Sequence, residues 1–134
     1  MADLDLMDDW PKHPVAWAKR AVVLTDIVGS VGLIERDEAG IISHWLDFVD
    51  HVKRSILPAH NGRLVKSLGD GMLLDFADVR SAVSAALAIQ RERARANAHR
   101  PSDRRIVLRS GIEVSDVIVE AEAEVVREVF RRYG

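Results

Sequence analysis

Apolar residues along this chain fall into short runs and into stripes at helical spacing. Five runs rich in apolar and β-branched residues predict strands, over 21–28, 64–68, 72–76, 106–112 and 114–120. Three stripes with three- and four-residue spacing predict helices, over 38–57, 78–96 and 122–133. The resulting order, β-α-β-β-α-β-β-α, indicates an α/β or α+β sandwich. In such a fold helices cover one face of a mainly antiparallel sheet.

A β-hairpin over 62–76 is the sharpest local signal. Gly69-Asp70-Gly71 separates its two apolar runs, and a short connection of Gly and Asp between such runs is typical of a hairpin turn. Glycine on both sides of Asp70 lets the backbone take positive φ. Asp70 is therefore held at a tight tip, with Lys66 four residues upstream. Taken alone, Asp70 is more simply a turn-forming residue, because Asp favours turns through backbone hydrogen bonds.

The run over 21–28 is almost continuously apolar and predicts a buried central strand. Asp26 interrupts it. A carboxylate in a buried strand must be hydrogen-bonded, paired or metal-bound, although Asp26 could also cap the strand end. Gly29 and Ser30 follow, at the start of a predicted helix. This arrangement points backbone N–H groups at an anion.

The helix over 38–57 has Asp37 at its N-cap position and ends before Pro58. His44 and His51 flank its apolar stripe. Without further ligating partners, both are expected to be solvated rather than bound to a metal. The expected core residues of this stripe are Ile41, Trp45, Phe48, Val49, Val52 and Ile56.

The helix over 78–96 begins at the N-cap Asp78. The basic stretch 91–100 is expected to be a solvated face that complements the helix dipole. The residues expected on the inner face are Val79, Val83, Ala86, Leu87 and Gln90.

Composition narrows the class of protein. The 134 residues suffice for one domain with a real core. A net charge of −2 argues against a nucleic-acid partner bound through bulk charge. No apolar run reaches the length of a membrane span. The start of the chain is acidic, unlike a signal peptide, and there are no cysteines, so we expect a cytoplasmic protein with no membrane partner.

Two acidic residues now combine into a candidate site. If the strand over 21–28 lies beside the hairpin, Asp26 and Asp70 converge on one edge of the sheet. Two close carboxylates repel each other, and a divalent cation such as Mg²⁺ or Mn²⁺ removes that penalty. The N–H groups of Val28, Gly29 and Ser30 would bind phosphates beside the metal. This combination implies phosphoryl or nucleotidyl chemistry.

Residues 25–30 (TDIVGS), followed by residues 62–71 (GRLVKSLGDG), resemble the class III adenylate/guanylate cyclase catalytic domain. The resemblance covers about residues 20–120, and residues 108–117 resemble the family's next strand pair. It implies a ferredoxin-like β-α-β-β-α-β core of the nucleotidyl cyclase type. The implied reaction converts ATP into 3′,5′-cyclic AMP and pyrophosphate, in cyclic-nucleotide signalling.

The resemblance also assigns residues. It implies that Asp26, Asp70 and the carbonyl of Ile27 hold two ions, Mg²⁺ or Mn²⁺. It implies that Lys66 contacts the purine, and a lysine there is similar to adenylate rather than guanylate cyclases. The implied partner is a second cyclase domain, in a head-to-tail homodimer or a complementing chain, because each domain supplies different parts of the active sites.

The family's pattern then departs from this sequence. The family continues with an Asp-containing base-recognition loop and with an Asn and an Arg on a helix, whereas residues 121–134 contain no Asn or Asp. We expect an arm over 1–19, a partial cyclase domain over 20–120, and a diverged C-terminal helix over 121–134, with the family's last elements missing. No catalytic residue is identified, so we expect the isolated chain to have weak or no cyclase activity.

Two other interpretations stay open. A catalytically inactive pseudocyclase, which binds nucleotide or a partner domain, would fit the missing Asn and Arg. A receiver-like signalling domain would fit the strand over 22–26, but the acidic pair that would hold Mg²⁺ at the preceding strand end is lacking.

Overall fold

The structure is a computed structural model that describes residues 15–120. Residues 20–115 form one compact unit, within which the core and the sites below lie. The predicted helix over 122–133 and most of the predicted arm over 1–19 lie outside the described residues, although a strand already begins at residue 15. The elements are β1 (Val15–Ile27), α2 (Ser30–Arg36), α3 (Glu38–His51), η1 (Val52–Ile56), α4 (Leu57–Ala59), β2 (Arg63–Ser67), β3 (Gly71–Phe76), α5 (Val79–Asn97), η2 (Ser102–Arg104) and β4 (Leu108–Glu120).

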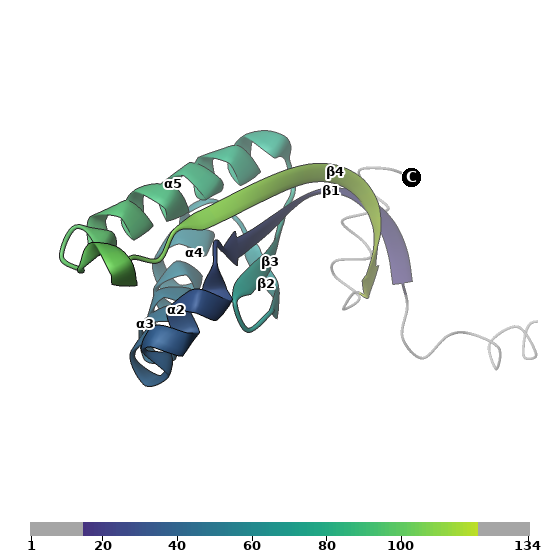
Figure 1. Cartoon of the computed structure of the whole chain (residues 1–134). Coiled ribbons are helices and arrows are strands. Elements are labelled where there is room, and N and C mark those ends of the chain that lie inside the picture. The colour runs from purple at the N-terminus through teal and green to yellow at the C-terminus, as the bar shows by residue number, and fades with distance from the viewer. Residues whose placement is uncertain (1–14, 121–134) are drawn as a thin grey trace, which may run out of the picture. The chain divides into compact units, whose positions relative to one another are not determined.

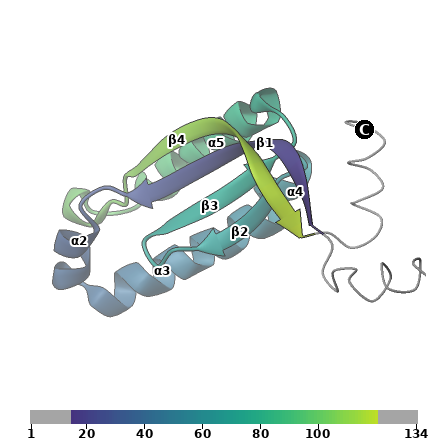
Figure 2. The ribbon, with the colours of Figure 1, turned by 90° about the vertical axis from the view of Figure 1, so that its right-hand side faces the viewer.

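Four strands form one sheet in the order β2-β3-β1-β4. β3 is antiparallel to both β1 and β2. Along β1 and β4, Thr25 lies beside Ser110 and Val28 beside Val107, so these strands also run in opposite directions. Figures 1 and 2 show α3 and α5 on the same face of the sheet. The prediction of an antiparallel α+β sandwich with a β-α-β-β-α-β core is thus confirmed.

The predicted strands over 106–112 and 114–120 are one continuous strand, β4. The prediction of two separate strands was wrong. Gly111 does not adopt a positive φ, and the chain continues through it as an extended strand. The apolar pattern continues on both sides of Gly111, and nothing in it distinguishes a turn from an extended glycine.

The helix that begins at Glu38 extends beyond its predicted end. Asp37 caps its start by accepting a hydrogen bond from Gly40 N. Near its C-terminal end the helix widens into the π-helical turn η1, where Leu57 N–H donates to Val52 C=O, and Pro58 lies just after that turn. A proline cannot donate, and its ring crowds the carbonyl four residues earlier. The wider turn lets the helix pass Pro58 and end at Ala59.

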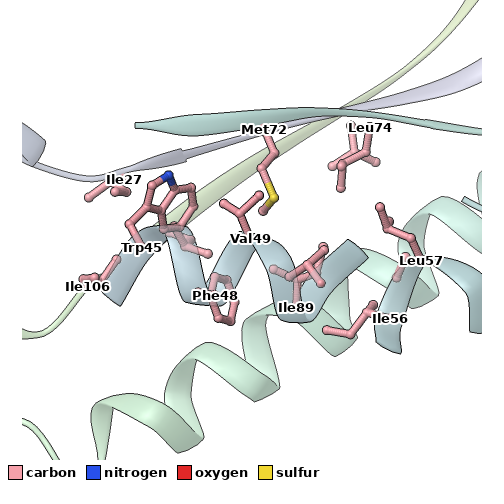
Figure 3. Packing of buried hydrophobic residues seen from close by; sticks show 14 of the residues in the cluster. Ile27, Trp45, Phe48, Val49, Ile56, Leu57, Met72, Leu74, Ile89 and Ile106 are labelled. Atoms are coloured by element: carbon pink, nitrogen blue, oxygen red, sulfur yellow. The ribbon is translucent and has the colours of Figure 1, made fainter. Parts of the chain in front are cut away.

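The core lies between the sheet and the helices. Figure 3 shows Met72 and Leu74 pointing from β3 toward α3, and Ile89 of α5 within the same cluster. Trp45 and Phe48 are buried in the core, as predicted, and the centroids of their rings lie 5.8 Å apart. The cluster comprises Ala21, Val23, Ile27, Leu33, Ile41, Trp45, Phe48, Val49, Val52, Ile56, Leu57, Met72, Leu74, Phe76, Ala82, Ala85, Ile89, Ile106 and Leu108.

The face that helix α5 presents to the core overlaps only partly with the predicted one, since Ala86 is buried as predicted but the predicted valines and Leu87 are not. Its N-cap is confirmed, because Asp78 accepts from Ser81 N at 2.7 Å. Leu87 is half exposed, and Val79 and Val83 are exposed as well. The buried residues are Ala82, Ala85, Ala86, Ile89 and Arg93. Small alanines face the sheet because they allow the helix to approach closely, so the larger valines and Leu87 point outward.

Strand β1 lies between β3 and β4, as predicted for a central strand, but it is buried on one face only. Val23 and Ile27 point into the core, whereas Leu24 and Val28 are 46% and 45% exposed. Side chains two residues apart share a face of a strand. Asp26 therefore lies on the same face as Leu24, away from the helices, where it does not require the pairing that a buried carboxylate would. None of the helices in the described part is long and apolar enough to cross a bilayer.

Candidate metal and phosphate site

Asp26 and Asp70 come from neighbouring positions at one end of the sheet. Asp26 is paired in register with Gly71, and Ile27 N–H donates to Asp70 C=O at 2.9 Å. The hairpin tip thus lies against the last residues of β1. The backbone of Asp26 and the backbone of Asp70 thus lie side by side, as expected from the sequence. Two carboxylates at adjacent strand ends, together with the backbone carbonyl of Ile27 next to Asp26, are the type of oxygen donors that a hard divalent cation binds.

The two glycines of the hairpin tip have different roles. Gly69 adopts a φ of +76°, as expected for a turn glycine. Gly71 does not use this freedom, because it has no positive φ. A Cβ at Gly71 would lie 2.5 Å from the carbonyl oxygen of Thr25. Gly71 is therefore required because β1 and β3 approach closely beside Asp26.

Ser30 links Asp70 to the start of α2. Its hydroxyl donates to Asp70 Oδ2 at 2.9 Å, a contact that the sequence did not indicate. Gly29 before it has a φ of 65° and supplies no side-chain cap. The N–H of Val28 donates to Val107 C=O at 2.8 Å. It is therefore not free to bind a phosphate, which contradicts our expectation for Val28. Gly29 and Ser30 remain the candidate phosphate donors, since the first N–H groups of a helix lack partners within it.

Arg109 of β4 is the site residue that the sequence analysis missed. Its Nε and Nη2 donate to the two carboxylate oxygens of Asp26, at 2.8 and 3.3 Å. The Asp26 carboxylate raises the pKa of Arg109 through this hydrogen bond and its charge. The only signal in the sequence was an arginine in the apolar strand. The guanidinium of Arg109 therefore neutralises the charge of Asp26.

Residues of this chain fit the expected ions only in part. No group of three or more His, Asp or Glu side chains gathers within residues 15–120. Asp26 and Asp70 thus supply two carboxylates, and backbone or substrate oxygens would have to complete the coordination. Mg²⁺ is commonly held in this way, by one or two carboxylates together with substrate phosphates.

Lys66 projects from the same face of the sheet as Asp26. It pairs with Leu73 across β2 and β3, after a bulge that follows Leu64, and Leu73 pairs in turn with Leu24. Directly opposed residues share a face, and Leu24 shares its face with Asp26. Lys66 is exposed. The structure places the predicted base-reading residue on the site's face of the sheet, two strands away from Asp26.

Two adjoining hollows mark this open face. One, of about 300 Å³, is lined by Leu24, Asp26, Arg109, Ser110 and Gly111. The other, of about 390 Å³, shares Leu24 and Gly111 with it. Its remaining lining residues are Val22, Leu73, Ile112 and Glu113. The Asp26–Arg109 pair therefore stands at the edge of a shallow, largely apolar depression.

Comparison with known proteins points to one class. No protein-family model matches the sequence. A Rhizobium meliloti (strain 1021) protein named "Putative adenylate cyclase 3" is 36% identical over 104 residues, which are 75% of this chain and 17% of that protein. The crystal structure of an adenylate/guanylate cyclase/hydrolase from Silicibacter pomeroyi is similar, with a TM-score of 0.71 and 27% identity. That match covers 81% of this chain and 63% of the other.

A bacterial light-regulated adenylyl cyclase has the same fold, with a TM-score of 0.71 and 16% identity, over 84% of this chain and 35% of that one. The antiparallel α+β fold is that of a nucleotidyl cyclase-type domain. The chain belongs to the class III adenylate/guanylate cyclase catalytic-domain family. It spans about a sixth of the length of the Rhizobium meliloti relative, at 17%, and 63% of the Silicibacter pomeroyi chain.

Proposed function

We propose that this chain is the metal- and nucleotide-binding part of an adenylate cyclase, which forms cyclic AMP and pyrophosphate from ATP. The observation that carries the proposal is the backbone register that brings Asp26 and Asp70 to adjoining positions. Divalent ions, when bound, would neutralise the triphosphate and activate the ribose 3′-hydroxyl. Asp26, Asp70 and the carbonyl of Ile27 are the groups of this chain that would hold them.

The chain's other residues would position the nucleotide. The N–H groups of Gly29 and Ser30 lie at the start of α2 and would donate to phosphate oxygens. Arg109 would be released from Asp26 when a metal ion binds there, because both cations need the same carboxylate oxygens. Its guanidinium, three-quarters exposed, could then pair with the triphosphate.

Metal-dependent ATP binding and product formation test this proposal. We expect Asp70→Ala and Asp26→Ala to abolish Mn²⁺-dependent ATP binding by the full chain, measured by calorimetry, and any cyclic AMP formed from Mn-ATP. Asp50→Ala is the matched control, because that exposed carboxylate pairs with Arg54 on α3 and η1, away from the sheet. Equal binding and equal product by wild type and Asp70→Ala would overturn the proposal. Binding without product would assign the chain to the pseudocyclase alternative.

Preference for ATP over GTP is proposed to come from Lys66. Lys66 is exposed and faces solvent, so its replacement should leave stability unchanged. We expect Lys66→Met to lower the ratio of ATP to GTP affinity while Mn²⁺-dependent binding of the triphosphate persists. An unchanged ratio would remove Lys66 from base recognition and leave the metal part of the proposal intact.

A second cyclase domain is proposed as the partner that completes the site. Lys66 and Asp26 lie two strands apart on one open face. A nucleotide bound between two such faces could therefore contact Asp26 of one chain and Lys66 of the other. Mixing Asp70→Ala with Lys66→Met in equal amounts should then create some shared sites with both residues intact, which recover the wild-type ratio of ATP to GTP affinity that neither variant shows alone. No recovery in the mixture, with both variants folded, would contradict a site shared between two chains.

A further inference from the structure

His44 of α3 and Arg93 of α5 form a hydrogen bond between two basic side chains. Arg93 Nη2 lies 2.7 Å from His44 Nε2. A guanidinium has only donors, so His44 Nε2 must accept and the ring proton must sit on Nδ1. This arrangement can exist only while His44 is neutral. The sequence analysis expected both residues to be solvated, and the structure corrects this for both.

Arg93 is held in the helix interface as a buried cation. It is 1% exposed, and its guanidinium carbon lies 4.8 Å from the centroid of the Phe48 ring. Figure 3 shows Phe48 on the side of α3 that faces α5. No carboxylate in the described part of the chain pairs with Arg93, and its Nη1 has no hydrogen-bond partner there. The imidazole of His44 is therefore one of the few groups that accept from this cation.

The charges that act on His44 are mainly positive. Burial lowers the pKa of His44, and the positive charges of Arg93 and Arg100 lower it further. Asp47 on the same helix acts in the opposite direction. Burial also lowers the pKa of Arg93, to about 10, which leaves it cationic at neutral pH. Farther along the interface, His51 lies 3.8 Å from Glu92 and forms a separate pair.

We propose that His44 and Arg93 form a proton-sensitive latch between α3 and α5, closed while His44 is neutral and released when His44 is protonated. Protonation removes the acceptor and places two cations 2.7 Å apart within a partly buried interface. The latch is distinct from the nucleotide site and holds whether or not the proposed cyclase function is correct.

The latch connects to the strand that carries Arg109. Arg93 Nε donates to Asn97 Oδ1 at 3.2 Å. The Asn97 side chain in turn makes two hydrogen bonds with the backbone of Ile106, at 2.7 and 3.0 Å. Ile106 leads directly into β4. Release of Arg93 would therefore loosen the residue that fixes the start of β4, in addition to the contact between the helices.

The direction of the pH effect follows from proton binding in the two states. An unfolded histidine has a pKa of about 6.5. His44 in the folded protein binds its proton less readily, so the unfolded chain takes up the proton first as the pH falls. Stability is thus fully present above about pH 6.5 and is lost progressively as the pH falls through the lower pKa of the folded state.

Urea unfolding of the full chain at pH about 7.5 and about 5.5 tests the latch. His44→Gln keeps an acceptor oxygen for Arg93 but cannot be protonated. We expect the folded-to-unfolded ratio of wild type to fall several-fold more on acidification than that of His44→Gln. His99→Gln is the matched control, because it removes an exposed histidine and should retain the wild-type response. Equal losses in wild type and His44→Gln would overturn the proposal.

Nuclear magnetic resonance of the imidazole nitrogens gives a second, independent readout. We expect His44 to carry its proton on Nδ1 at neutral pH and to titrate with a midpoint below about 6.5. Arg93→Met, if folded, should raise that midpoint by removing the adjacent charge. A wild-type midpoint at or above the ordinary value, or a proton on Nε2, would contradict the latch even if Arg93→Met failed to fold.

Discussion

Arg109 binds both carboxylate oxygens of Asp26, through its Nε at 2.8 Å and its Nη2 at 3.3 Å. This two-point pair joins the end of β1 to β4 on the exposed face of the sheet. Side chains of both partners contact solvent, so the pair contributes little to the stability of the fold. Its significance lies in the site, since it occupies the carboxylate that a metal ion would need.

Removing Arg109 should therefore make metal binding easier. We expect Arg109→Met to raise the affinity of the nucleotide-free chain for Mn²⁺ by a small factor, because the ion no longer competes with a guanidinium for Asp26. Titration of Mn²⁺ followed by electron paramagnetic resonance measures this directly. Arg36→Met serves as the control, since that arginine donates to the carbonyl of Asp103, away from the site. Weaker Mn²⁺ binding by Arg109→Met would show that Arg109 does not compete with the metal.

Gly71 should not tolerate a side chain. A Cβ there would meet the carbonyl of Thr25 at 2.5 Å, and this neighbour is strand backbone that cannot rotate away. We expect Gly71→Ala to lower the free energy of unfolding by about 1–3 kcal/mol, the usual cost of overpacking. Gly111→Ala is a matched strand control, because a Cβ at Gly111 meets nothing within 4 Å. Similar unfolding curves for both variants would contradict the close approach of β1 and β3.

Asp75 should be important for stability although it lies on the open face of the sheet. It is 3% exposed and accepts from Arg20 at 2.8 and 3.0 Å and from Arg63 at 3.1 Å. Asp75→Ala would leave two arginines facing each other without a carboxylate. We expect a loss of about 2–3 kcal/mol, below the cost of breaking a fully buried pair because both arginines reach solvent.

Urea unfolding measures this loss, and Arg63→Ala provides the comparison. Arg63 is 59% exposed and makes one of the three bonds, so its removal should cost less than about 1 kcal/mol. A larger effect from Arg63→Ala than from Asp75→Ala would place the stabilisation in the arginine's packing rather than in the carboxylate.

The sequence predicted those features that depend on local pattern. Alternation and turn residues located the hairpin, and strand-end positions made Asp26 and Asp70 candidates for one site. Features that depend on which surfaces meet in space could not be predicted. The pairing of Arg109 with Asp26 spans 83 residues, and an arginine in a strand is usually only solvated. Likewise, nothing local to Arg93 indicates that it packs under Phe48 rather than facing water.

The orientation of α5 shows the same limit and gives the last prediction. Leucine and valine positions suggested an inner face containing Leu87, yet Ile89 is fully buried and Leu87 is 49% exposed. We expect Ile89→Ala to cost about 2–5 kcal/mol, because it leaves a cavity between α5 and the sheet. Leu87→Ala removes a similar number of carbons from an exposed position and should stay within about 1 kcal/mol of wild type. If urea unfolding instead showed Leu87→Ala to be the more damaging change, α5 would pack through the face that its apolar pattern suggested.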